Sequence, residues 1–266
     1  MSLTGAILGD IAGSRFEFEK EIADWNSCEL YNKNSVFTDD TVQSLAIGMA
    51  AITHKDYAKS LAEICNKYLF VGYGGNFHRW LLNPGTAQCN SWGNGSAMRV
   101  SAIGEIADSL SEAEEMAAAS AKCTHNSYEG IKGAKAIAGC VYLAKKGSSK
   151  KEILKYAQAL YPGEKYEYPP ERKLCEYRET YKFEVSCQNS VPVAIRCFLE
   201  STDFESCLRN VFYVNGDTDT LGSMAGSIAG SYYGMGGLDV ENILKYYLDD
   251  ELFELWSTII TYISNH

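Results

Sequence analysis

Two short acidic segments, far apart in the chain, each place two aspartates at a predicted helix start. One reads Thr38-Asp39-Asp40-Thr41 and the other Asp217-Thr218-Asp219-Thr220. Either segment alone could be a helix cap, because Asp and Thr accept hydrogen bonds from the first turn and acids oppose the helix dipole. A cap needs only one side-chain oxygen, however, and crowded carboxylates are costly inside a protein unless a cation neutralises them. The two segments together therefore favour a shared metal site.

The side chains of these segments also limit the kind of metal. Carboxylate and hydroxyl oxygens are hard ligands, which suit Mg²⁺ or Mn²⁺. Four aspartate charges match two divalent cations, a recurrent arrangement for orienting a substrate and activating water. Glu17, in Ser14-Arg15-Phe16-Glu17, is a further acidic candidate. A solvated surface glutamate is the ordinary alternative for that residue.

A glycine-rich turn between the acidic segments could bind phosphate. It reads Trp92-Gly93-Asn94-Gly95-Ser96 and leads into a helix that we expect to begin near Ala97. Glycines let the backbone approach a ligand, and the N–H groups of a helix start can bind phosphate. A hairpin-like turn at Asn94-Gly95 is the alternative. Arg99 could face the phosphate or pair with an acid of the metal site.

Two other segments could border the same ligand. Gly72–Asn76 is a second glycine-rich loop, close to Phe77 and Trp80, whose rings could form the wall of a nucleotide pocket or belong to the core. His125 stands at the end of a predicted helix. It could compensate the helix dipole there or serve the site directly.

Most of the chain shows the apolar period of helices, and strand alternation is almost absent. We predict an all-α fold of about ten helices in a single domain over residues 1–266. The clearest helical segments are residues 41–51, 57–70, 111–123, 130–144, 151–160, 191–200, 221–234, 240–248 and 252–263.

One segment departs from this pattern. Residues 161–190 contain three of the five prolines and many tyrosines, and they lack a clean helical period. We expect an irregular excursion that carries a short hairpin or forms a lid over the site. A surface insertion with no role in the chemistry is the alternative.

Two segments near opposite ends of the chain resemble one another. Gly5–Ser14 and Gly222–Ser231 both fit the pattern GxxxGxIAGS. Small residues four apart form a flat helix face that lets another backbone approach closely. We therefore expect these two helices to lie in the core and to pack against each other.

Composition excludes several classes of protein. The chain has 266 residues, of which 46% are hydrophobic, and this is typical of a packed globular protein rather than a disordered one. A net charge of −10 disfavours nucleic acid as a partner. No segment has the length and apolar character of a membrane span. Nine scattered cysteines without a CxxC pair fit a reduced, cytoplasmic protein, which we expect to be a monomer.

Five motifs, in order, resemble those of the ADP-ribosylglycohydrolases: GAILGDIAGSRFE, TDDT, SWGNGSAMR, TH and GDTDT. The resemblance covers residues 5 to about 234 and implies an orthogonal all-α bundle with a binuclear Mg²⁺ or Mn²⁺ centre. Its implied metal ligands are Thr38, Asp39, Asp40, Asp217, Asp219 and Thr220. By the same resemblance, Glu17 matches a mobile glutamate that can ligate metal or act on the substrate. The family often has Gly-Gly-Asp where this chain has Asn215-Gly216-Asp217.

The resemblance also implies a substrate site and a reaction. Trp92, Gly93, Asn94, Gly95 and Ser96 would hold a diphosphate and its nearby ribose, and His125 would lie near the distal ribose. The expected reaction is hydrolysis of the glycosidic bond between ADP-ribose and an acceptor, which releases ADP-ribose. The general base would be Glu17 or a cluster aspartate, for which Asp39 and Asp219 are the candidates.

Two other functions stay open on the sequence. The same carboxylates could serve a Mg²⁺-dependent nucleotide phosphohydrolase. The chain could also bind ADP-ribose without turnover, or have a structural role, since the resemblance extends to a lens crystallin. The acceptor is also open between arginine, serine, a nucleobase and a small metabolite.

Overall fold

The computed structural model describes residues 1–19, 21–84 and 89–266, and these residues form fourteen α-helices, two 3₁₀ turns and no β-strand. The all-α prediction is therefore confirmed. The helices are α1 (Ser2–Gly13), α2 (Asp39–Thr53), α3 (Tyr57–Cys65), α4 (Gly75–Leu82), α5 (Ser101–Ile106), α6 (Leu110–Lys122), α7 (Tyr128–Lys145), α8 (Lys150–Leu160), α9 (Leu174–Thr180), α10 (Cys187–Glu200), α11 (Phe204–Val214), α12 (Thr218–Tyr233), α13 (Val240–Tyr247) and α14 (Asp250–Asn265), and the 3₁₀ turns are η1 (Ser14–Phe16) and η2 (Asn94–Ser96).

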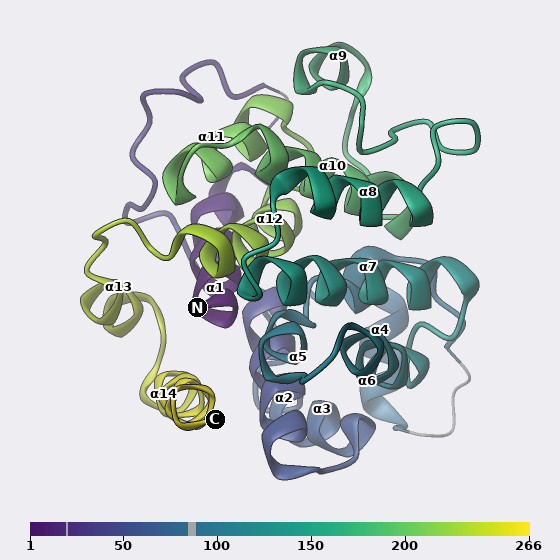
Figure 1. The fold of residues 1–266 in the computed structure, drawn as a ribbon. Coiled ribbons are helices and arrows are strands. Elements are labelled where there is room, and N and C mark those ends of the chain that lie inside the picture. Colours follow the sequence, from purple (N-terminus) through teal and green to yellow (C-terminus); the bar gives the residue numbers. More distant parts are fainter. Residues whose placement is uncertain (20, 85–88) are drawn as a thin grey trace.

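Helices α1 and α12 lie side by side in the middle of the molecule (Figure 1). A Cβ atom added to Gly9 would overlap the carbonyl oxygen of Gly222, and one added to Gly5 would overlap that of Gly226. The two backbones are in direct contact, which only glycine permits at these positions. The predicted pairing of the GxxxGxIAGS helices is confirmed. It joins the first and last thirds of the chain.

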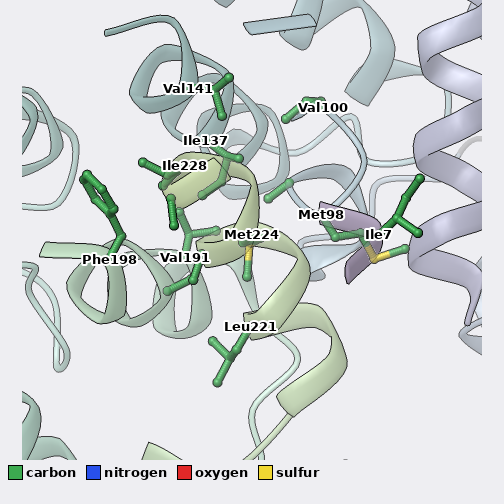
Figure 2. Packing of buried hydrophobic residues seen from close by; sticks show 14 of the residues in the cluster. Ile7, Met98, Val100, Ile137, Val141, Val191, Phe198, Leu221, Met224 and Ile228 are labelled. Atoms are coloured by element: carbon green, nitrogen blue, oxygen red, sulfur yellow. The ribbon is translucent and has the colours of Figure 1, made fainter. Parts of the chain in front are cut away.

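The apolar face of α12 forms the centre of the core. Leu221, Met224 and Ile228 of this helix belong to one buried hydrophobic cluster with Ile137 of α7 and Phe198 of α10 (Figure 2). All five side chains are buried. Burying an aliphatic or aromatic side chain contributes about 1.5–3 kcal/mol. This packing fixes the start of α12, where the second acidic segment lies.

The segment 91–101 differs from its prediction. We expected an α-helix from about Ala97, but η2 is a single 3₁₀ turn and the next α-helix begins at Ser101. The backbone of the turn is held by residues distant in sequence instead. Asn94 N–H donates to the Val185 carbonyl at 2.8 Å, and Cys187 N–H donates to the Trp92 carbonyl at 2.9 Å.

The excursion at residues 161–190 contains helix α9, and α10 already begins within it. The expected hairpin is absent from these residues, all of which are described; their only bridge is an isolated one between Ser186 and Gly93. Tyr161 and Tyr177 are fully buried, so the segment is anchored to the core. Val185 and Cys187, near the end of the segment, form backbone hydrogen bonds with the Trp92–Ser96 turn.

No helix of the described residues has both the length and the apolar character needed to cross a membrane.

Candidate metal and substrate site

The carboxylate of Asp10, in α1, fixes the start of α2. Asp10 is fully buried and accepts hydrogen bonds from the N–H groups of Thr38 and Thr41 at 3.0 and 3.1 Å. It also accepts both threonine hydroxyls, that of Thr38 at 2.7 Å. The first acidic segment is therefore held against α1, and Asp39 and Asp40 occupy the first turn of α2.

The second acidic segment meets the first at this point. The Thr220 hydroxyl lies 3.3 Å from Oδ2 of Asp40, which joins the start of α12 to the start of α2. Glu17, just beyond η1, has a carboxylate oxygen within 4.8 Å of oxygens of Asp217 and Asp219. The close packing of α1 on α12 brings Glu17 here, and Thr218 donates to the Gly13 carbonyl at 2.8 Å. The two acidic segments predicted from the sequence thus form one cluster.

Burial raises the pKa of every carboxyl group of this cluster. It is the largest cause in each case, and it raises the pKa of Asp10 to about 6, of Asp217 to about 7 and of Glu17 to about 8. Burial and then the nearby Asp219 charge raise the pKa of Asp39 and of Asp40 well above the usual range. The pKa of Asp219 is likewise raised by burial and by Asp217.

The cluster has the donors that a hard cation requires. Oδ1 of Asp40 is buried and has no hydrogen-bond partner among the described residues. No Lys or Arg of the described chain forms an ion pair with the cluster aspartates. Buried carboxylates without a counter-charge fit a divalent cation, which would reverse the rise in their pKa values.

A cavity of about 610 Å³ opens onto this cluster. Its volume lies in the range of small-molecule sites. Phe77 lines it, whereas Trp80 is buried in the core. A second cavity of about 520 Å³ shares Glu17 and Phe183 with the first. The predicted site residues that line the first cavity are Glu17, Asp39, Asp40, Trp92, Gly93, Asn94, Gly95, His125, Asp217, Asp219 and Thr220.

Two predicted site residues do not line the cavity. Ser96 is fully buried and its hydroxyl donates to the Gly130 carbonyl at 2.7 Å, so the side chain fixes the turn instead of facing a ligand. The Thr38 hydroxyl is engaged by Asp10 and accepts the Asp40 N–H at 3.2 Å, as a helix cap does.

Two polar side chains near the turn have partners other than the predicted ones. Asn94 does line the cavity, but its amide donates to Oδ2 of Asp217 at 2.6 Å. Arg99 is fully buried and neither faces the cavity nor forms an ion pair with an acid. It donates instead to Gln43 and Thr124, at 2.8 Å each.

Three residues of this region do not follow from the sequence patterns. Asp10 lies inside the first small-residue motif, and a lone acid within an apolar helix was the available signal. Gln43 lies one helical turn after Asp39 and donates to its Oδ2 at 2.7 Å. Phe183 comes from the excursion, where no local pattern marks it.

Comparisons with known proteins identify the family of this chain. The family model of ADP-ribosylglycohydrolase matches residues 1–262. ADP-ribosylhydrolase ARH3 of Homo sapiens is 31% identical over 310 residues, covering 88% of this chain and 84% of that protein. The Bos taurus protein of the same name is 30% identical over 308 residues, with the same coverage. A solved structure, "ADP-ribosylglycohydrolase-related protein complex", matches with a TM-score of 0.72 at 21% identity, over 98% of this chain and 96% of that one.

The all-helical fold is shared with that solved structure, and in this chain it places a buried carboxylate cluster beside a ligand-sized cavity. The chain belongs to the ADP-ribosylglycohydrolase family. It is a hydrolase of ADP-ribose glycosidic bonds, acting on ADP-ribosylated substrates and releasing ADP-ribose.

Proposed function

We propose that the carboxylate cluster holds two divalent cations, Mg²⁺ or Mn²⁺. The ligands would come from both acidic segments: Asp39, Asp40 and the remaining lone pair of the Thr38 hydroxyl from the first, and Asp217, Asp219 and Thr220 from the second. The observation that carries the proposal is the buried, unpartnered Oδ1 of Asp40 among carboxylates with no ion-pair partner. Bound cations would neutralise these charges, bind ribose hydroxyls and act as Lewis acids.

The cavity would hold ADP-ribose with its distal ribose toward the cluster. The Trp92–Gly95 turn supplies backbone that can approach a diphosphate closely, and the His125 ring packs against Gly95 of this turn. Trp92 is 54% exposed at the rim, where its ring can cover a sugar or base. We assign Ser96 a supporting role, through the shape of the turn.

Glu17 is the carboxylate we assign to proton transfer. It is half-buried and lies where the two cavities meet, so that water and acceptor can both reach it. Its carboxylate would take a proton from the attacking water, and Asp39 and Asp219 would stabilise the positive charge that develops on the ribose.

The acceptor would lie in the second cavity, beyond Glu17. Phe18 and Phe183 stack there with ring centroids 5.9 Å apart, and both are exposed. The nine free cysteines support a reducing compartment such as the cytoplasm. We further propose a single domain that acts as a monomer, which light scattering at several concentrations would test.

Calorimetric titration of ADP-ribose, with Mg²⁺ and then with EDTA, tests the site. The proposal expects binding that requires the metal. Turnover of ADP-ribosylated arginine, serine and nucleic-acid substrates should then yield intact ADP-ribose. Release of inorganic phosphate instead would favour a phosphohydrolase, and binding without turnover of any of these substrates would favour a binding protein.

A further inference from the structure

Arg99 is a buried cation between the two halves of the site. It is fully buried, and no carboxylate of the described residues pairs with it. Its guanidinium donates to oxygens of Gln43, Ser120 and Thr124, at 2.8, 3.0 and 2.8 Å. Burying a charge against neutral partners is costly, and packing alone would be served better by an apolar side chain.

One arm of this network leads to the metal cluster. A guanidinium has hydrogen-bond donors only, so Gln43 must present its side-chain oxygen to Arg99. The amide nitrogen of Gln43 then faces Asp39 and donates to its Oδ2 at 2.7 Å. The Asp39 carboxylate also accepts only, so the two neighbours of the amide require the same orientation. Without Arg99 the amide oxygen would lose its partner, and only the Asp39 bond would hold the side chain. Arg99 therefore reinforces the orientation in which the amide donates to Asp39.

The other arm leads to His125. The Thr124 hydroxyl accepts from Arg99 and lies 2.8 Å from Nδ1 of His125. A hydroxyl has one proton to donate. The competing acceptor is the Cys123 thiol, which is a weak acceptor and directs its own proton to the Ser120 carbonyl. Nδ1 is the stronger of the two acceptors, and a Thr124 proton directed at it places the ring proton of neutral His125 on Nε2.

The Nε2 edge of His125 faces the candidate substrate turn. A Cβ added to Gly95 would lie 3.2 Å from this nitrogen, and both residues line the cavity. Burial, followed by the Arg99 charge, lowers the pKa of His125 well below its usual value, which keeps the ring neutral. Nε2 is not hydrogen-bonded to any other described residue, so its N–H is available to a ligand.

We propose that Arg99 is a positioning residue that determines which groups act as hydrogen-bond donors in both halves of the site. Through Gln43 it holds an N–H donor on Asp39, and through Thr124 it holds His125 as an Nε2–H donor toward the cavity. The part that concerns ADP-ribose rests on the proposed function. The tautomer of His125 does not, since it can be measured on the protein alone.

Nitrogen NMR of the histidine side chains tests the second arm directly. The chain has four histidines, and a His125→Gln variant identifies the signal. We expect wild-type His125 to be protonated at Nε2 only. Thr124→Val keeps the side-chain shape but removes the hydroxyl, and it should give a mixture of tautomers. Thr124→Ser restores a hydroxyl and should restore the single tautomer.

Two titrations separate the arms. Thr124→Val should weaken ADP-ribose binding about five- to tenfold, the loss of one hydrogen bond, and leave Mg²⁺ affinity unchanged. Gln43→Leu should weaken Mg²⁺ binding and leave the His125 tautomer unchanged. Arg99→Lys should alter both measurements, because a single ammonium cannot reproduce the planar fork. Melting curves verify that each variant is folded.

Three results would overturn the proposal. One is a wild-type His125 protonated at Nδ1. The second is an unchanged tautomer and unchanged ADP-ribose affinity in Thr124→Val. The third is unchanged Mg²⁺ affinity in Gln43→Leu. If wild-type protein binds no ADP-ribose, the proposed function fails, while the tautomer and Mg²⁺ measurements still decide the network.

Discussion

Asp10 binds Thr38 through both of its carboxylate oxygens. Oδ1 accepts the threonine hydroxyl at 2.7 Å, and Oδ2 accepts the threonine N–H at 3.0 Å. Thr38 is the N-cap of α2, so one buried acid on α1 sets where α2 begins. Asp39 and Asp40 follow directly, and their positions depend on a residue that lines no part of the cavity.

Asp10→Asn should therefore displace Asp39 and Asp40, although Asp10 itself does not line the cavity. The amide offers one acceptor oxygen instead of two and adds donors that face other donors. We expect unfolding free energy to fall by about 1–3 kcal/mol, with weaker Mg²⁺ binding. Urea denaturation with and without Mg²⁺ measures both effects. Asp24→Asn, at an exposed position, is the matched control, and equal behaviour of the two variants would contradict this role.

Asp219→Asn removes one charge from the centre of the cluster. Changes in the residues that merely support metal ligands typically cost 10–100-fold in metal affinity or activity, so loss of a ligand should cost at least about 100-fold. Turnover of an ADP-ribosylated substrate and Mg²⁺ titration check this. Full turnover together with normal Mg²⁺ affinity would show that Asp219 is not a ligand.

The stability of the metal-free protein should fall as pH rises, and the stabilisation by Mg²⁺ should grow. The pKa values of about 6 for Asp10, 7 for Asp217 and 8 for Glu17 all exceed the unfolded values near 4. The folded protein therefore binds more protons, and its stability should fall as pH rises from about 4 to about 8 in EDTA. Mg²⁺ binds the ionised carboxylates, so the rise in melting temperature on adding Mg²⁺ should grow over the same range. A metal effect independent of pH would argue against the cluster as the binding site.

Gly9→Ala should unfold or strongly destabilise the protein. Its methyl group would overlap the Gly222 carbonyl, which is backbone and cannot turn aside. Overpacking of this kind costs about 1–3 kcal/mol or more. Gly75→Ala, where an added methyl meets no atom within 4 Å, is the control for thermal melting. Similar melting temperatures for both variants would mean that α1 and α12 are less tightly packed than described.

Phe18→Ala tests the proposed acceptor side. Phe18 lines the second cavity and not the first, and it is 81% exposed. We expect a higher KM for ADP-ribosylated protein substrates and an unchanged affinity for ADP-ribose. Phe70→Ala, at an even more exposed site (97%) that borders neither cavity, serves as control. An unchanged KM would place the acceptor elsewhere.

Much of this protein could be predicted from local patterns. Helical periodicity identified most helices, because an amphipathic helix shows its buried face in the sequence. The paired aspartates of Asp39-Asp40 and Asp217–Asp219 stood out because carboxylates and threonines together at a helix start exceed what capping needs. The GxxxGxIAGS repeat predicted that α1 and α12 pack together, since small residues four apart have little other use.

The tertiary structure decided what each of these residues touches. The sequence suggested that Ser96 faces a ligand and that Arg99 meets phosphate or an acid. Both are instead buried, and their partners Gly130, Gln43 and Thr124 come from other elements. The role of Asp10 could not be predicted from the sequence for the same reason. Asp10 caps the start of α2 only because α2 packs against α1. Hydrogen-bond partners across helices depend on side-chain direction and packing, which the periodicity of a single segment does not encode.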